Sequence, residues 1–373
     1  MIKEYTSLGL MSGTSGDGVD ASIIYSDGST KYKAIKDKYF EYDHKIHKNI
    51  HYLKEKIQNI SDLKKFTNEL NELEKSITLF HAKVINEISD NHNIGLVGFH
   101  GQTIYHNSKE KISKQIGDGK LLSQLIKKKV VYDFRQNDIK NGGEGAPLSS
   151  IFHQLIASQK KLDLPLCILN IGGISNITII NEPTGSFGFT SRDIGPGNCL
   201  VDTWVRKNSK QKFDKDGILA TRGKRDNIIF EQAQELFSNR SNKDSLSFDV
   251  NDFDVSFARG LSLEDGAATL TDFTARIISG SLSSLLSTIN NKVVKILICG
   301  GGRKNKALIE KIKKNILKNF VIQNIDDYGI NGDFVESQAF AFLAIRSVLK
   351  LPISFPQSTG CNKPSTGGEI VKY

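Results

Sequence analysis

The sequence predicts an α/β fold arranged as two lobes, and three observations support this prediction. Apolar runs of strand length alternate with amphipathic helical patterns along most of the chain. The length of 373 residues exceeds a single average domain of roughly 100–200 residues. An apolar strand, a turn rich in glycine, serine or threonine, and a returning strand occur in residues 8–24 and again in residues 166–180. Two such halves suit a nucleotide held between lobes.

The first part of the chain predicts four strands and one long helix. Alternation of apolar and polar residues indicates the strands, and apolar residues spaced by three or four, from Leu63 to Ile88, indicate the helix. In order, we expect strands at residues 7–11, 19–25 and 31–42, a helix from about 44 to 89, and a strand at 94–99.

The same criteria predict continued alternation in the rest of the chain. Glycines stop two of the later strands, at Gly172-Gly173 and at Gly300-Gly301-Gly302. We expect strands at residues 130–132, 166–170, 176–180 and 293–298, and helices at 148–156, 200–204, 264–289, 305–317 and 335–349.

Composition and charge exclude several protein classes. The 50 lysines and arginines outnumber the 41 aspartates and glutamates, which gives a net charge of +9. The basic residues are dispersed and no zinc-finger spacing occurs, so nucleic acid is not an expected partner. No apolar run approaches the ~20 residues that cross a bilayer, and the N-terminus becomes polar too quickly for a secretion signal. We therefore expect a cytoplasmic protein that does not contact membranes.

The strongest candidate for phosphate binding is the turn after the first strand, residues 11–20 (MSGTSGDGVD). Its glycines let backbone N–H groups approach a phosphate chain, and Thr14 and Ser15 add hydroxyl donors. Asp17 or Asp20 can hold Mg²⁺ through water. A glycine-rich hairpin with a polar turn is the alternative. No GxxxxGK[ST] motif occurs in the chain, which disfavours a P-loop fold.

Two further strand ends carry glycine turns. Residues 170–176 (NIGGISN) offer a second phosphate cradle, although a tight hairpin explains this motif equally well. Residues 299–305 (CGGGRKN) lead from a strand into a helix N-terminus, which suits an adenine–ribose edge or a phosphate. A Rossmann site is disfavoured because Asn305 stands in the place of the last glycine of GxGxxG.

A general base is predicted at Asp193, beside the rigid turn Gly195-Pro196-Gly197. The alternative is a structural carboxylate that caps a helix next to a proline turn. Asp202 and Trp204 follow on the predicted helix.

Other polar residues are candidates for substrate binding. His100, Gln102 and Thr103 come directly after a buried strand, although the histidine can equally be a satisfied core residue. Arg135 can hold a carboxylate as a bidentate fork, which lysine cannot reproduce. Glu336 opens the last predicted helix, where a surface glutamate favoured by the helix dipole is the alternative.

Taken together, these motifs resemble those of the anhydro-N-acetylmuramic acid kinases, a bacterial family within the actin, heat-shock chaperone and sugar-kinase superfold. The resemblance runs from Met11 to about Ala344 and therefore covers nearly the whole chain. In order, the matching stretches include MSGTSGDGVD, HGQTI, DFR, GAPL, NIGGISN, GPGN, CGGGRKN and AFAFLA.

The resemblance implies two RNase H-like lobes with ATP in a central cleft. One lobe is expected to comprise residues 1–134 and 337–373, and the other residues 135–336. The implied reaction opens the 1,6-anhydro ring of 1,6-anhydro-N-acetylmuramic acid with water and phosphorylates O6, giving N-acetylmuramic acid 6-phosphate and ADP, in cell-wall recycling. ATP and Mg²⁺ are the implied cofactors, and a homodimer is common in the family.

By the resemblance, Asp193 deprotonates the attacking water. From the residues of the turn, Asp17 is expected to hold the metal ion, directly or through water. The residues expected to bind ATP are Gly13, Thr14, Ser15, Gly16, Asp17, Gly18, Val19, Asp20, Gly172, Gly173, Gly300, Gly301 and Gly302. The residues expected to bind the sugar are His100, Gln102, Thr103, Arg135, Gly195, Asn198 and Glu336.

Three positions depart from the family pattern. Glu144 stands where glutamine is usual, Ser150 where proline is common, and Arg192 where an aromatic residue is expected. The charge of Glu144 near the expected cleft can alter sugar affinity. Two rival functions stay open: a sugar kinase that acts on a pre-existing hydroxyl, and an actin- or chaperone-like ATP switch that binds protein.

Overall fold

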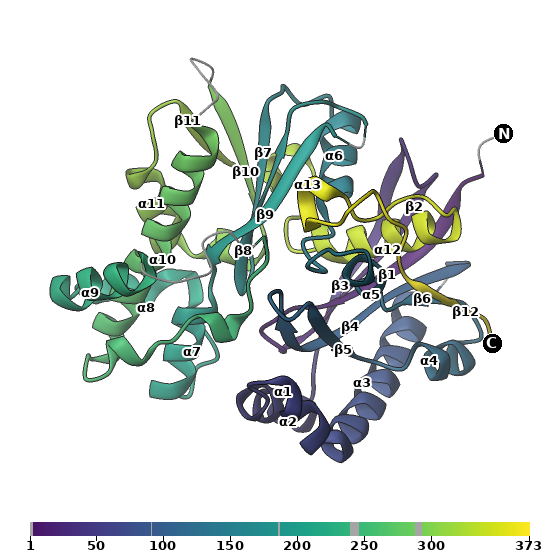
Figure 1. Cartoon of the computed structure of the whole chain (residues 1–373), viewed down its shortest axis with the longest axis horizontal. Coiled ribbons are helices and arrows are strands. Elements are labelled where there is room, and N and C mark those ends of the chain that lie inside the picture. The colour runs from purple at the N-terminus through teal and green to yellow at the C-terminus, as the bar shows by residue number, and fades with distance from the viewer. Residues whose placement is uncertain (1–2, 91, 186, 239–245, 288–292) are drawn as a thin grey trace. The chain divides into compact units, whose positions relative to one another are not determined.

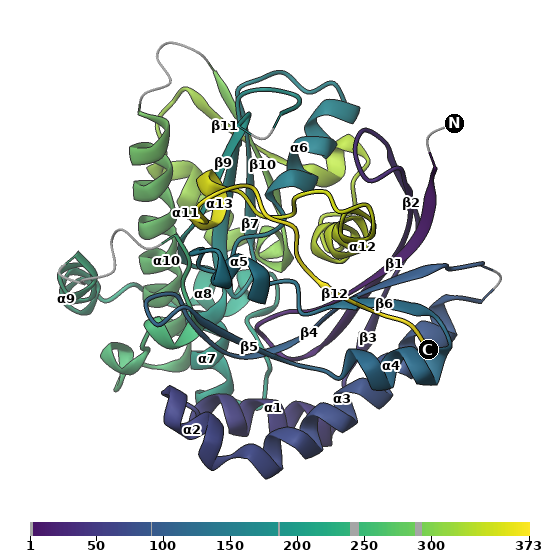
Figure 2. The same ribbon diagram turned by 45° about the vertical axis from the view of Figure 1, so that its right-hand side comes forward.

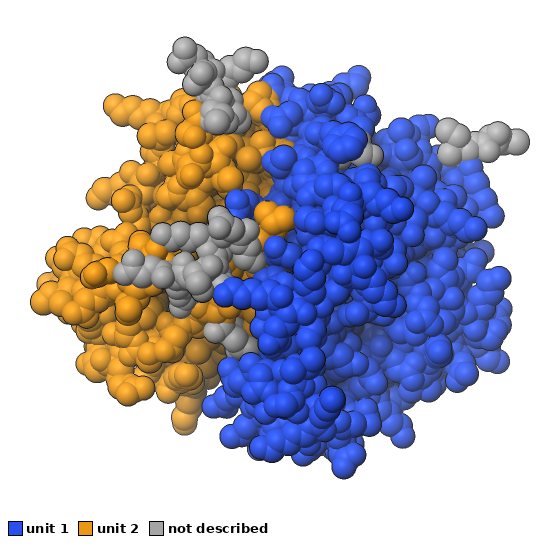
Figure 3. All heavy atoms as spheres, viewed as in Figure 1, with its two compact units in different colours: residues 1–164, 180–192, 333–373 blue, residues 165–179, 193–332 orange. Residues whose placement is uncertain are grey.

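The computed structural model describes residues 3–90, 92–185, 187–238, 246–287 and 293–373. It divides into two compact units (Figure 3). Unit 1 comprises residues 1–164, 180–192 and 333–373, and unit 2 comprises residues 165–179 and 193–332. Each unit contains a sheet with helices packed on it, which confirms the predicted α/β class with two lobes.

Unit 1 is built on a mixed sheet. Its strands are β1 (Tyr5–Ser12), β2 (Gly18–Ser26), β3 (Tyr32–Glu41), β4 (Leu96–Asn107), β5 (Ile112–Ile116), β6 (Lys129–Tyr132) and β12 (Glu369–Val371). Its helices are α1 (His44–Lys56), α2 (Ile60–Lys65), α3 (Thr67–Ile88), α4 (Gly119–Ile126), α5 (Gln136–Lys140), α6 (Ser150–Gln159), α12 (Val335–Val348) and α13 (Pro356–Thr359).

The strand order of this sheet is β12-β6-β4-β1-β2-β3, and β5 pairs with β4. The hairpins β1–β2 and β2–β3 are antiparallel, whereas β1–β4 and β4–β6 are parallel. Figure 2 shows α12 on one face of the sheet and α3 on the other. Helix α12 approaches so closely that a Cβ on Gly98 would lie 2.3 Å from the Phe340 carbonyl oxygen.

Unit 2 has a second sheet of the same design. Its strands are β7 (Leu166–Ile171), β8 (Ile174–Ile180), β9 (Phe189–Pro196), β10 (Val294–Cys299) and β11 (Phe320–Asn324). Its helices are α7 (Cys199–Asn208), α8 (Ile218–Arg222), α9 (Asn227–Ser238), α10 (Leu263–Leu286) and α11 (Lys306–Asn315). Strand β8 ends and β9 begins in the short stretch 180–192 that groups with unit 1.

The order β11-β10-β7-β8-β9 repeats the order β6-β4-β1-β2-β3 of unit 1 (Figure 1). The pairs β7–β10 and β10–β11 are parallel, like their counterparts. Apolar residues of β7, β10 and β11 form one core with helices α10 and α11. The internal similarity that residues 8–24 and 166–180 suggest is therefore present in the sheets.

The prediction of one helix over residues 44–89 is wrong, because the segment forms the three helices α1, α2 and α3. A new helix starts at Asn59, whose side chain accepts from backbone N–H groups while the Asp62 side chain accepts from the Asn59 N–H. Such a capping box restarts a helix despite continuous apolar spacing. The helix predicted at 264–289 is α10, Leu263–Leu286, and residues 288 and 289 lie outside the described residues.

The strand predicted at 94–99 is longer than expected, because β4 continues to Asn107. His100, Gln102 and Thr103 therefore lie within a strand and not after one. The sequence analysis did not predict β5, β9, β11 or β12.

Residues 135–164, 180–192 and 333–336, assigned to the second lobe in the sequence analysis, group with unit 1 in the structure. Helix α6 accounts for the grouping of residues 135–164 through aromatic contacts and hydrogen bonds. The Phe152 ring centre is 4.9 Å from that of Tyr32 and 5.6 Å from that of Phe342. Gln159 exchanges two side-chain hydrogen bonds of 2.7 Å with the Tyr32 backbone. Among the described residues, no helix is both long and apolar enough to span a bilayer.

Candidate functional site

The first phosphate-loop candidate connects β1 to β2 in unit 1, and neighbouring elements hold its backbone. Three hydrogen bonds to loop carbonyl oxygens hold it. Gln102 Nε2 on β4 donates to the Gly13 oxygen (3.0 Å), and Lys54 Nζ on α1 donates to the Thr14 oxygen (2.6 Å). The N–H of Tyr42, the residue after β3, donates to the Asp17 oxygen (2.9 Å). The loop is thus ordered by the protein before any ligand binds.

Two glycines of this loop have different surroundings. Gly16 has a φ of +67°, and a Cβ there would lie 2.8 Å from Ile50 Cγ2 on α1. Both the backbone conformation and the close packing therefore require glycine at this position. A Cβ on Gly13 would meet no atom closer than 4.0 Å, so this part of the loop has space beside its backbone.

A buried polar network that the sequence analysis missed lies at the base of the loop. Ser12 Oγ is 2.7 Å from the Tyr42 hydroxyl and 3.4 Å from His81 Nε2. Burial lowers the pKa of His81 to about 4, so the ring is neutral near pH 7. His81 Nδ1 donates to the Ile77 carbonyl oxygen (2.8 Å), which leaves Nε2 as the acceptor. The only sequence signal for this network is His81, a polar residue at a core position of the helical pattern.

His100 and Arg135 are brought together in unit 1. Arg135 Nη2 lies 3.0 Å and Nε 3.3 Å from His100 Nε2. His100 Nδ1 donates to the Gly101 carbonyl oxygen (2.8 Å), so Nε2 accepts from the guanidinium. Burial and the neighbouring guanidinium charge hold the pKa of His100 well below its usual value. The neutral imidazole therefore orients Arg135 and does not compete with it for an anion.

Gln102 and Thr103 lie beside this pair on β4. Both are buried, and Gln102 uses its Nε2 to hold the phosphate loop. Its Oε1 is buried with no partner among the described residues. The Thr103 hydroxyl oxygen accepts from Gln115 Nε2 on β5 (3.0 Å), so β5 supplies a contact that the sequence analysis did not foresee.

The loop around Glu144 is organised by a buried carboxylate. Asp138 Oδ2 accepts from the Gly145 N–H (2.7 Å) and Oδ1 from the Thr359 hydroxyl (2.6 Å). The Glu144 N–H donates to the Thr359 carbonyl oxygen (2.8 Å). Asp138 therefore has a structural role, and the Glu144 side chain is half-buried on a firmly held backbone.

In unit 2, two glycine motifs far apart in the sequence form one corner. The N–H groups of Gly197 and Cys199 donate to the Gly173 carbonyl oxygen (2.8 and 3.2 Å), and the N–H of Asn198 donates to that of Gly172 (2.8 Å). A Cβ on Gly197 would lie 2.2 Å from the Gly172 oxygen. The β7–β8 turn and the start of α7 are therefore joined backbone to backbone.

Asp193, the predicted base, lies on β9 just before this corner. Its side chain is buried, with 6% of its surface exposed. Asp193 Oδ2 accepts from the Phe248 N–H (2.8 Å), and the Asp193 N–H donates to the Leu246 carbonyl oxygen (2.8 Å). The segment 246–248 thus holds the carboxylate, and no motif in the sequence pointed to it.

The third glycine motif follows β10 in unit 2. Cβ atoms on Gly300 and Gly302 would collide with Asn170 Oδ1 and Ile171 Cγ2, at 2.3 and 2.2 Å, so these glycines serve packing against β7. Gly301 has no atom within 4 Å of a Cβ and leaves space for a ligand. Arg303 is held by Asp326 through an Nε–Oδ2 contact of 2.7 Å.

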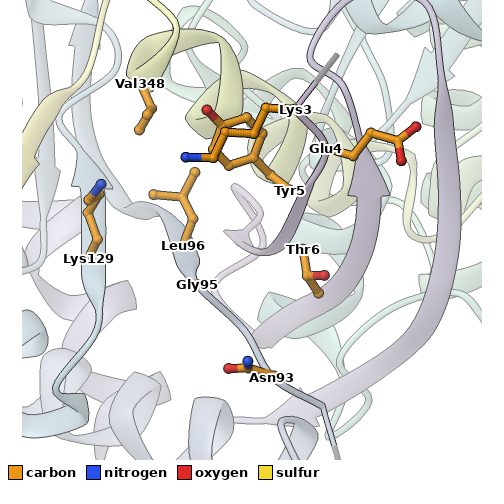
Figure 4. Close-up of a pocket in the computed structure, with 9 residues that line it drawn as sticks. All are labelled: Lys3, Glu4, Tyr5, Thr6, Asn93, Gly95, Leu96, Lys129 and Val348. Carbon is orange, nitrogen blue, oxygen red and sulfur yellow. The ribbon is translucent and has the colours of Figure 1, made fainter. Parts of the chain in front are cut away.

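The remaining predicted residues are placed as follows. Gly18, Val19 and Asp20 open β2, Gly195 lies on β9, and Glu336 is half-buried in the first turn of α12 in unit 1. A pocket of about 310 Å³ in unit 1 lies elsewhere, at the amino-terminal ends of β1, β4 and β6 (Figure 4). The glycine loop follows the carboxyl end of β1, so this pocket belongs to the opposite edge of the sheet.

Comparison with known proteins extends these motifs to the whole chain. Residues 5–373 match the anhydro-N-acetylmuramic acid kinase family. The chain is 56% identical over 378 aligned residues to the anhydro-N-acetylmuramic acid kinase of Pelagibacter ubique (strain HTCC1062), with 100% of both chains covered. It is 36% identical to the enzyme of that name from Zymomonas mobilis (strain ATCC 31821 / ZM4 / CP4), which covers 98% of this chain and 99% of the relative.

Among solved structures, component A of the Acidaminococcus fermentans (R)-2-hydroxyglutaryl-CoA dehydratase is similar, with a TM-score of 0.44 and 14% identity, covering 93% of this chain and 100% of the other. The full-length match and the 56% identity confirm the resemblance that the motifs indicated. The chain therefore belongs to the anhydro-N-acetylmuramic acid kinase family.

Proposed function

We propose that this chain is an ATP-dependent kinase that opens the 1,6-anhydro ring of 1,6-anhydro-N-acetylmuramic acid with water and phosphorylates O6. The products are N-acetylmuramic acid 6-phosphate and ADP, and the reaction serves cell-wall recycling. The observation that carries this proposal is family membership along residues 5–373, with relatives of the same length.

Asp193 is the proposed general base. Its carboxylate takes a proton from water, and the water oxygen bonds to the anomeric carbon while the bond from that carbon to O6 breaks. O6 then carries the electron pair that attacks the γ-phosphorus, and ADP leaves. The hydrogen bond from the Phe248 N–H supports this role, because it holds the carboxylate in one orientation.

The β1–β2 loop is the proposed phosphate site. Backbone N–H groups and hydroxyls of residues 13–15 would contact the phosphates. In unit 2, Gly172, Gly173 and Gly301 are the residues proposed to bind ATP. Asp17 and Asp20 carry carboxylate oxygens, the donor type that Mg²⁺ takes, so the loop fits this ion. Mg²⁺ bound at Asp17, directly or through water, would neutralise phosphate charge.

Arg135 is the proposed partner of the lactyl carboxylate of the sugar. Its guanidinium donates to the neutral acceptor His100 Nε2, which orients the planar group. A planar fork aimed in this way binds a carboxylate through two parallel hydrogen bonds. Gln102, Thr103, Gly195, Asn198 and Glu336 are proposed as further sugar contacts.

The test is to incubate the full chain with ATP, Mg²⁺ and the anhydro-sugar and to follow ADP release and the mass of the sugar product. We expect ADP and a sugar that has gained both water and a phosphoryl group. Phosphorylation of ring-opened sugars alone would favour the sugar-kinase rival, and ATP turnover that the anhydro-sugar leaves unchanged would favour the protein-binding switch. Either result overturns the proposal. The cytoplasmic location and the homodimer stay predictions.

A further inference from the structure

Three side chains that can bind a metal ion meet beside the β1–β2 loop of unit 1. One donor atom each from Asp17, His47 and His51 lies within 4.8 Å of the other two. His47 Nε2 is 3.1 Å from Asp17 Oδ1, and the ring centres of His47 and His51 are 4.4 Å apart. All three residues are only part-buried.

Helix α1 places two of these donors, and a hydrogen-bonded loop residue supplies the third. The Asp43 side chain caps α1 by accepting from the Ile46 N–H (2.8 Å), which sets the start of the helix. His47 and His51 are four residues apart and therefore project from the same face of α1. Asp17 is held to the same region, because its carbonyl oxygen accepts from the Tyr42 N–H just before the helix. The two histidines are thus positioned by α1, and Asp17 by a hydrogen bond from the residue after β3.

The donor types select the kind of ion. Mg²⁺ takes oxygen ligands and keeps several waters, whereas Zn²⁺ takes imidazole nitrogens at ~2.0–2.1 Å together with carboxylate oxygens. Two histidines four apart on one helix face are a known zinc-binding arrangement, and three protein ligands leave a fourth position for water. The 3.1 Å between His47 Nε2 and Asp17 Oδ1 is close to the ligand–ligand distance, roughly 3.3 Å, that such bonds imply.

The geometry points to a binding site for a divalent transition-metal ion, best suited to Zn²⁺, formed by Asp17, His47 and His51. This site lies outside the proposed chemistry except for Asp17, which it shares with the Mg²⁺ position. A Zn²⁺ ion held by the two histidines withdraws the Asp17 carboxylate from the nucleotide-bound Mg²⁺. Zn²⁺ therefore weakens Mg–ATP binding, and this second step rests on the proposed function.

The direct test uses the full chain after treatment with a chelator, titrated with Zn²⁺ in a calorimeter and with Co²⁺ in a spectrophotometer. We expect one ion per chain and the visible absorption of nitrogen-ligated Co²⁺. His47→Ala and His51→Ala should each lower Zn²⁺ affinity at least ~10-fold, because even outer-shell partners of a metal are worth ~10–100-fold.

His44→Ala is the matched control, because His44 lies on the same helix but is exposed and outside the cluster. It should bind Zn²⁺ like the unaltered chain, and circular dichroism should show that all three variants are folded. Unchanged Zn²⁺ affinity in both folded His47→Ala and His51→Ala would overturn the site. The site would also be overturned if Mg²⁺ at the same concentration as Zn²⁺ competed equally well for it.

The second step is tested by the binding of a non-hydrolysable ATP analogue with Mg²⁺, in the presence and absence of Zn²⁺. Zn²⁺ should weaken analogue binding to the unaltered chain and leave its binding to His51→Ala unchanged. Intact Zn²⁺ binding without any effect on the analogue would overturn this step alone. If the chain proved not to be a kinase, the calorimetric result on the metal site would still stand.

Discussion

Units 1 and 2 share one strand order but join their first two strands in different ways. In unit 1, residues 13–17 form a loop held through side chains such as Gln102 and Lys54, with carboxylate and hydroxyl groups along it. In unit 2, the turn is only Gly172-Gly173, and its carbonyl oxygens accept from the backbone of residues 197–199. The same topology thus supports a turn that carries polar side chains and a turn that is joined backbone to backbone to residues 197–199. We call this second turn, with its contacts to residues 197–199, the backbone bracket.

The two units also differ in their titratable groups. All eight histidines of the chain lie in unit 1, and unit 2 has none. The group in unit 2 to which we assign proton transfer is the carboxylate of Asp193. Acid is therefore expected to lower the stability of unit 1 through its buried histidines.

The largest expected effect tests whether unit 2 supplies the base. Asp193→Asn should reduce turnover by ~10²–10⁴-fold, the usual worth of a positioned base, because the amide cannot take the proton. Affinity for ATP, measured by calorimetry, should stay nearly unchanged. The control is Asp254→Asn, which alters an exposed carboxylate of the same unit and should retain activity. Retention of more than about 1–3% of the rate in Asp193→Asn would remove the base assignment.

The second prediction concerns the backbone bracket. Gly197→Ala places a methyl group 2.2 Å from the Gly172 carbonyl oxygen, where neither backbone can yield easily. We expect a loss of ~1–3 kcal/mol in the free energy of unfolding, typical of overpacking. In the control Gly172→Ala, the methyl group would have its nearest neighbour at 3.5 Å, and its unfolding midpoint in urea should hardly change. Equal midpoints for the two variants would contradict the close contact.

The third prediction concerns the loop of unit 1. Gly16→Ala forces a left-handed residue and a contact of 2.8 Å with Ile50, so we expect a loss of ~1–2 kcal/mol in stability. Because the displaced loop is the proposed phosphate site, affinity for an ATP analogue should also fall. Gly13→Ala, where the nearest atom to the added methyl group is Ser15 Oγ at 4.0 Å, is the control for stability. If both variants unfold at the same urea concentration, the packing of Gly16 on α1 is not important.

The smallest expected effect near neutral pH is a change in the free energy of unfolding, and it comes from the buried histidines of unit 1. Burial lowers the pKa of His81 to about 4 and those of His106 and His153 to about 3. The unfolded chain binds these protons at a pKa of ~6.5, so stability is complete above that value and falls as the pH drops toward 4. Each group contributes at most ~1.4 kcal/mol per pH unit.

This loss can be measured by urea unfolding at a series of pH values, with hydrogen exchange to locate it. Amides of unit 1 should lose protection before those of unit 2. His81→Phe should reduce the slope of stability against pH between 6.5 and 4. A flat profile in that range, or earlier loss of protection in unit 2, would contradict the contrast between the units.

Much of the fold could be predicted because its elements carry local signals. The glycine turns after β1, β7 and β10 and the apolar pattern of α12 are examples. The breaks between α1, α2 and α3 were missed because apolar spacing continues across them, although Asn59 and Asp62 form a readable capping box. Strand β12 could not be predicted, because three residues form a strand only by pairing with the distant β6.

The candidate site was accessible from the sequence only where a motif is contiguous. The loop at residues 13–17 and the turn at Gly195–Gly197 were readable as glycine patterns. Two other contacts depend on which backbones meet in space. They are the contact between Gly172 and Gly197 and the hydrogen bond from the Phe248 N–H to Asp193. The backbone groups at Gly172, Gly197 and Phe248 are the same in every residue type, so no sequence signal marks these long-range partners.

The close approach of α12 to β1 and β4 has a consequence for how this chain is made. A ribosome delivers residues 1–164 first and residues 333–373 only after unit 2. Until then the grooves at Gly9 and Gly98, which receive the backbone of α12, have nothing to cover them. The nascent first half must therefore wait with an apolar sheet face uncovered during the synthesis of some 170 further residues. Unit 2, which emerges almost without interruption, can complete its core sooner.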